Sequence, residues 1–181
     1  RQARIAALIG ALSVPNWMPL LAKAGALVAV ILAFLSVGAL AGVAIQLLKG
    51  GAPIEGGLLL KGTLINATYF VLMAFGILAL QTLANNKYLG YLLGVGLFLL
   101  DTALGSLGLQ HRLFSFASLP PLTYSDMNGY GHFLEGWSWF ALYWALCALA
   151  MLILAQAFWV RGAARGWRLR LRAGFGQLPA G

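Results

Sequence analysis

Asp101 is the residue whose chemistry most needs an explanation, because it is the only charged side chain in an apolar run of about residues 88–109. An ionised carboxylate inside a bilayer is costly unless it is paired, hydrated or protonated. We therefore expect Asp101 to face the interior of a helical bundle, where Gln46 or Asn66 would hydrogen-bond to it. Two uses stay open: a packing role, or a place in a substrate or proton path.

Glycines share the predicted helix face of Asp101. With 3.6 residues per turn, four of them lie within about 60° of it around a helix: Gly90, Gly94, Gly105 and Gly108. Small residues let helix backbones approach closely, so this face should pack against another span. Gly38 and Gly42, in the first apolar run, are the candidate complement.

A second group of chemically capable residues lies in the polar connection 110–136. Four of its side chains are of types that ligate divalent metals: His111, Asp126, His132 and Glu135. Their spacing matches no metal motif, and Gly129 and Gly131 favour a turn rather than a helix that would align His132 with Glu135. We predict an ordered loop without a metal or other cofactor, with a metal site as the alternative.

The elements that position these residues are apolar runs long enough to cross a bilayer. The chain is 61% hydrophobic and 9% charged, unlike a soluble domain. Helices of this length exceed the roughly 30 Å hydrocarbon core at about 1.5 Å per residue. The sequence predicts an all-α, polytopic membrane bundle, residues 17–160, with four transmembrane helices at about 24–48, 63–83, 88–109 and 137–160.

The distribution of Lys and Arg predicts the orientation, since the cytoplasmic side carries the excess. One side of the four-span arrangement holds Arg1, Arg4, Lys23, Lys87, Arg161, Arg165, Arg168, Arg170 and Arg172, and the other holds Lys49, Lys61 and Arg112. Both termini are therefore predicted to be cytoplasmic. The acidic residues Glu55, Asp126 and Glu135 then lie outside, as does the whole loop 110–136.

The two ends of the chain have their own patterns. Within residues 1–16, helical spacing of apolar residues predicts an amphipathic helix in the membrane interface, or else the end of a preceding helix. Residues 161–181 form a basic tail whose arginines would contact anionic lipids or a cytoplasmic partner. The chain begins at Arg1 without Met, so we expect a segment of a longer polypeptide.

Several classes of protein are disfavoured. The net charge of +8 comes from residues that flank apolar runs rather than from a basic stripe, so we expect no nucleic-acid binding. Cys147 is the single cysteine and cannot form an internal disulfide or a multi-cysteine zinc site. Neither a phosphate-binding glycine loop nor an H-E-x-x-H helix is present, so no enzyme activity is predicted for this segment.

One stretch carries a family resemblance. Residues 124–133 read Y-S-D-M-N-G-Y-G-H-F, and a Trp-rich span and an arginine-rich tail follow. This pattern resembles the permease portion of bacterial proteins in which a type-two ATP-binding-cassette permease is fused to a zinc aminopeptidase. Within the loop, the residues that carry the resemblance are Tyr124, Asp126, Asn128 and His132.

The resemblance implies a multi-pass segment in the bacterial inner membrane that belongs to an exporter-type permease. It also implies a separate ATP-binding subunit, and either the remainder of a longer chain or a homo-oligomer, as partners. No catalytic residue can be carried over, since the peptidase motif is absent. The alternatives are a membrane anchor for a fused peptidase without transport, and a small metal-dependent membrane enzyme.

Overall fold

The computed structural model describes residues 17–50, 55–84, 87–108, 111–127 and 129–157. The predicted interfacial helix and the basic tail lie outside this part of the chain. Four helices are present within it: α2 (Trp17–Leu48), α3 (Gly56–Ala84), α4 (Lys87–Ser106) and α5 (Gly131–Ala157). They correspond in order to the four predicted spans. Three begin six or seven residues earlier than predicted, because each helix already starts before the apolar run that marks its span.

The ends of the helices follow from local sequence. Pro19 lies in the first turn of α2, where the backbone N–H that proline lacks would have no helical partner. At the other end, Lys49 N donates to Ile45 O at 3.0 Å, and Gly50 adopts a φ of 63° that ends the helix. The carbonyl of Glu55 accepts from Leu59 N at 3.0 Å, so Glu55 caps the start of α3.

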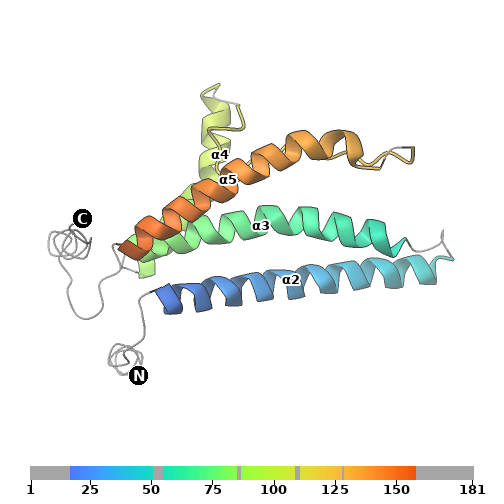
Figure 1. The fold of residues 1–181 in the computed structure, drawn as a ribbon, viewed down its shortest axis with the longest axis horizontal. Helices are drawn as coiled ribbons and strands as arrows, with labels where there is room; N and C mark the ends of the chain where they lie inside the picture. Colours follow the sequence, from blue (N-terminus) through green and yellow to red (C-terminus); the bar gives the residue numbers. More distant parts are fainter. Residues whose placement is uncertain (1–16, 51–54, 85–86, 109–110, 128, 158–181) are drawn as a thin grey trace, which may run out of the picture.

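α3 is the central helix of the bundle. It contacts α2, α4 and α5, and Figure 1 shows α2 and α5 running along it with α3 between them. α4 (yellow-green) contacts the last turns of α3 and then leaves it at a steep angle. We refer to the two ends of the bundle by α3, as the Gly56 end and the Ala84 end.

Three of the four helices are long and apolar enough to cross a membrane: α2, α3 and α5. In α4 the apolar stretch is shorter, Tyr88–Leu100. Hydroxyl groups within α2 and α3 donate to carbonyls one turn earlier in their own helix, as Ser36 Oγ does to Leu32 O at 2.7 Å and Thr68 Oγ1 does to Leu64 O at 3.0 Å. Such bonds satisfy polar side chains where no water is present. These properties indicate a helical membrane protein.

Buried residues gather toward the Ala84 end. Leu20 and Ala24 of α2 pack on Leu78 of α3, with Leu152 of α5 against them. A second cluster joins Leu72 of α3 to residues of α5 and of the segment that connects α4 with α5. The half of α3 from Leu72 to Ala84 is therefore the best-packed part of the described fold.

Candidate functional site

A cavity of about 790 Å³ lies between α2 and α3 at the Gly56 end. We call it the α2–α3 cavity. Its polar lining comes from α2, from α3 with its capping residue, and from the segment before α5: Gln46, Glu55, Thr63, Asn66, Tyr124, Asp126 and Tyr130. Its apolar lining includes Phe34 on α2 and Phe70 on α3. The cavity is thus polar and acidic on one side and apolar between the helices.

The loop side of this cavity is held by a tight turn. Ser125 and Gly129 exchange both backbone hydrogen bonds, at 3.1 and 2.7 Å, and Gly129 has a φ of 58°. Met127 lies between them in the chain with 98% of its surface exposed. The turn brings the Tyr124 and Tyr130 rings into an edge-to-face contact with centroids 5.4 Å apart.

Tyr130 immediately precedes α5, and its side chain reaches α3. Its carbonyl accepts from Phe133 N at 3.1 Å and Leu134 N at 3.2 Å, the first hydrogen bonds of that helix. A Cβ added at Gly62 would lie 3.6 Å from the Tyr130 hydroxyl, so the phenol stands against α3 at a residue without a side chain. One turn farther along α3, Asn66 Nδ2 donates to the Gly62 carbonyl at 2.8 Å.

The negative side chains at the mouth of the cavity act on Tyr124. Partial desolvation raises the pKa of the Tyr124 phenol, and the charges of Glu55, Asp126 and, less strongly, Tyr130 raise it further. A negative potential therefore extends over the rings at the mouth. Among the described residues that line the cavity, none is Lys or Arg.

A second cavity, of about 480 Å³, lies on the α4 side of α3. It shares Gly62, Asn66 and Tyr130 with the first, so these three residues stand between the two spaces. Its lining includes Leu97 and Phe98 of α4 and, toward the Ala84 end, Met73 and Phe116. We call it the α3–α4 cavity.

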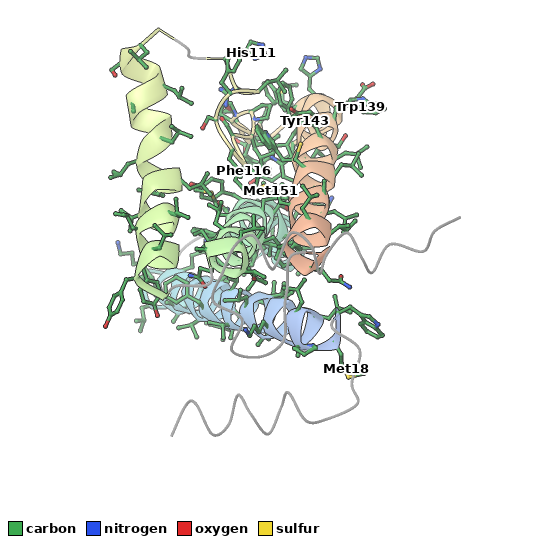
Figure 2. The ribbon with its side chains drawn as sticks, turned by 90° about the vertical axis from the view of Figure 1, so that its left-hand side faces the viewer. Met18, His111, Phe116, Trp139, Tyr143 and Met151 are labelled. Carbon is green, nitrogen blue, oxygen red and sulfur yellow. The ribbon has the colours of Figure 1, made fainter. Side chains whose placement is uncertain are left out.

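Phe116 closes that end of the α3–α4 cavity. A Cβ added at Gly76 would lie 2.5 Å from Phe116 Cε1, so the ring occupies the place where a side chain of α3 would be. Its other face meets Trp144 of α5, edge to face, at 5.2 Å. Figure 2 shows Phe116 in the space between α4 and α5, over α3.

The backbone that carries Phe116 is not helical. Arg112 Nη1 donates to Leu119 O at 2.7 Å across this short loop, and Ser118 N donates to Ser115 O at 3.2 Å. Ala117 is completely buried and has a φ of 61°, a conformation unusual for a residue with a Cβ. Trp144, 6% exposed, leaves its indole N–H without a partner. We call residues 112–119, Gly76 and Trp144 the aromatic layer.

The structure brings together some of the predicted polar residues. Gln46 and Asn66 line the same cavity, with Tyr124 and Asp126. Asp101 belongs to α4, but the structure does not describe its side chain. Asn128 is outside the described residues. The described lining of the α2–α3 cavity includes no residue of α4.

Some of the predicted packing glycines contact a different helix than expected, and others contact none. A Cβ at Gly90 would lie 3.0 Å from Gln81 Cγ, and one at Gly94 would lie 3.3 Å from Ile77 Cγ2, so both glycines pack on α3. At Gly38 and Gly42 a Cβ would meet no atom within 4 Å. The contact expected between these glycines and the third span is therefore not found, because α3, the helix before α4 in the chain, lies against α4. Gly108, with a φ of 79°, follows the end of α4, and the Gly105 position lies within that helix.

The candidate metal ligands do not assemble. The expected turn is present at Gly129, but α5 begins two residues later at Gly131, so His132 and Glu135 do share a helix. His132 is exposed and its ring contacts Phe133, while His111 contacts Phe114. The described residues contain no group of three His, Cys, Asp or Glu side chains that would hold a metal.

Sequence reasoning did not find the aromatic layer. Trp144 was interpreted as part of an aromatic belt at headgroup level, whereas it is buried in the middle of α5. Gly76, the pair Phe116 and Ala117, and Trp144 stand far apart in the chain, and no spacing rule links them. Glu55 was considered only for its charge, and its position at the start of α3 could not be predicted, because glutamate is not among the residues that favour the N-cap.

No protein-family model, no curated protein and no solved structure matches the chain. What the fold defines is the class, a helical membrane protein with three long apolar helices and a shorter fourth.

Proposed function

We propose that this chain is a membrane-spanning segment of an exporter-type permease of the ATP-binding-cassette class, with ATP hydrolysed by a separate subunit. The observation that carries the proposal is the aromatic layer, a non-helical segment packed against the middle of two long apolar helices. Trp144 is 13 residues from either end of α5, or roughly 20 Å. If α5 spans the bilayer, Phe116 lies well inside it.

Irregular backbone at that depth points away from a simple anchor. In hydrocarbon, unpaired backbone N–H and C=O groups are so costly that non-helical segments occur only where protein buries them or where they line a water-filled cavity. Within residues 112–119, Ser115 and Ala117 are buried, Phe116 packs on α5, and the segment lines the α3–α4 cavity. A helix pair that only tethers an enzyme has no need of such a segment.

The two cavities and the layer have the arrangement that alternating access requires. With the predicted orientation, the Gly56 end faces outward in the bacterial inner membrane, and the cavities lie toward that side. The aromatic layer and the packed half of α3 close the inner side. Gly76, which has no side chain, leaves a notch in the surface of α3 that the Phe116 ring fills, and we call it the Gly76 notch. Movement of Phe116 out of this notch would join the α3–α4 cavity to the inner side.

ATP-driven motion would reach this layer through the cytoplasmic ends of the helices. α3 ends at Ala84 and α4 begins at Lys87, and Gly90 and Gly94 pack α4 against α3 near these ends. A subunit that pushed on these helix ends would move α3 relative to α5. The basic tail 161–181 is the other predicted contact for the subunit.

The test uses the full-length protein reconstituted with its nucleotide-binding subunit. Asn66→Cys, in a background with Cys147→Ser, places a thiol in both cavities, and Leu60→Cys places one on the exposed apolar face of α3 as the matched control. We expect a membrane-impermeant maleimide to label the first variant and not the second. ATP with vanadate should change the labelling rate of the first variant.

Two results would contradict the proposal. Failure of the full-length protein to copurify with any nucleotide-binding subunit would remove its energy source. Labelling of Asn66→Cys that is identical with and without nucleotide would indicate a static membrane anchor, the alternative considered from the sequence.

A further inference from the structure

We propose that the α2–α3 cavity binds an amphipathic organic cation, with the charged group at the Glu55 and Asp126 carboxylates and the apolar body between α2 and α3. That such a cation is also the exported solute rests on the transport function proposed above. The binding site itself does not depend on transport.

The size and the two-sided lining of the cavity select this class of ligand. A volume of about 790 Å³ lies within the roughly 300–1,000 Å³ of small-molecule sites. The apolar lining includes Phe34 of α2 and Phe70 of α3. A small inorganic ion would leave this lining without a partner.

The charge at the mouth selects the sign. Glu55 and Asp126 line the cavity on different elements, the cap of α3 and the turn before α5, and both charges reach the Tyr124 phenol. In the described lining, no basic side chain neutralises them. The two carboxylates would repel an anion and attract a cation, and added salt would screen both effects.

The tyrosines at the mouth fit the same ligand. Tyr124 and Tyr130 pack edge to face, and their ring faces are suited to a cation, which is attracted by the negative face of an aromatic ring. Asn66 and Gln46 add neutral polar groups on the helix side. The carboxylates, the rings and the apolar side chains thus line one cavity.

The experiment measures binding of tetraphenylphosphonium to the purified full-length protein in nanodiscs, by calorimetry at low and high salt. We expect saturable binding that weakens with salt. The double variant Glu55→Gln with Asp126→Asn should bind on the order of tenfold more weakly, which corresponds to about 1.4 kcal/mol. Glu135→Gln, which removes a carboxylate outside the described lining, should bind as the wild type does.

A ligand of the same shape and opposite charge gives a test that needs no variant. Tetraphenylborate should show no saturable binding that depends on the cavity. Equal binding of both ions, no binding of the cation, or an unchanged affinity in the double variant would each overturn the proposed site.

Transport is tested separately in proteoliposomes that also contain the nucleotide-binding subunit. ATP-driven movement of the cation that the double variant loses supports both proposals. Binding that needs the carboxylates, without ATP-driven movement, supports the site and contradicts the transport function. ATP-driven movement that survives the double variant keeps the transport function and overturns the site.

Discussion

The two halves of α3 differ in what surrounds them. From Gly56 to Phe70 the helix borders the two cavities described above and a third, apolar one toward α5, and Ala67 is its only buried residue there. From Leu72 to Ala84 it is packed by α2, α5 and the aromatic layer, and contains the remaining buried positions. One continuous helix therefore serves as a cavity wall at one end and as a closed core at the other, with Phe116 near the border.

Removing the Phe116 ring should have the largest effect on this contrast. We expect Phe116→Ala to lower the stability of the full-length protein in detergent by about 2–4 kcal/mol, because half-buried aromatic packing on Gly76 and Trp144 is lost. The apparent midpoint of thermal unfolding measures it. Phe114→Ala, at an exposed position of the same loop, is the control and should change little.

Filling the Gly76 notch should lower the stability of the protein somewhat less than removing the Phe116 ring does. Gly76→Ala places a Cβ 2.5 Å from Phe116 Cε1, so the ring must shift, at about 1–3 kcal/mol for overpacking. Gly42→Ala on α2, where a Cβ meets nothing within 4 Å, should not destabilise the protein. Equal midpoints for the two variants would mean that Phe116 does not occupy the notch.

The hydrogen bond that closes the loop around Phe116 comes next. Arg112→Met removes the bond from Nη1 to Leu119 O, and we expect a loss of about 1 kcal/mol, because the guanidinium is partly exposed. Limited proteolysis between α4 and α5 should become faster. An unchanged cleavage rate would contradict a structural role for this bond.

A substitution on the cavity side should have the smallest effect on stability. Asn66→Leu removes an amide that donates to the Gly62 carbonyl of its own helix, so the stability should change by less than about 0.5 kcal/mol. A large loss there would erase the difference between the two halves of α3. The thermal midpoint, measured beside that of Phe116→Ala, gives the comparison directly.

The four helices could be predicted from the sequence because hydropathy and length alone mark them. The direction of α4 could not, since apolar runs carry no information about crossing angles. Gly90 and Gly94 were correctly identified as lying on one face, but their partner is α3, and periodicity does not name a partner. The cavity residues Gln46 and Asn66 were selected as polar groups in apolar runs, whereas Gly76 and Phe116 meet through the tertiary fold alone.

The Gly76 notch also sets an order of assembly. Residues 76 and 116 are 40 positions apart, so α3 is synthesised with an open groove that its own chain fills only later. Contacts of α3 with α2 and with α4 join helices that are consecutive in the chain, and such local contacts form fast. Docking of α5 and Phe116 must follow, and until then the groove is exposed to lipid or to an insertion factor. Completion of this bundle is therefore a late event in biosynthesis, which requires the Phe116 ring to pack against Gly76.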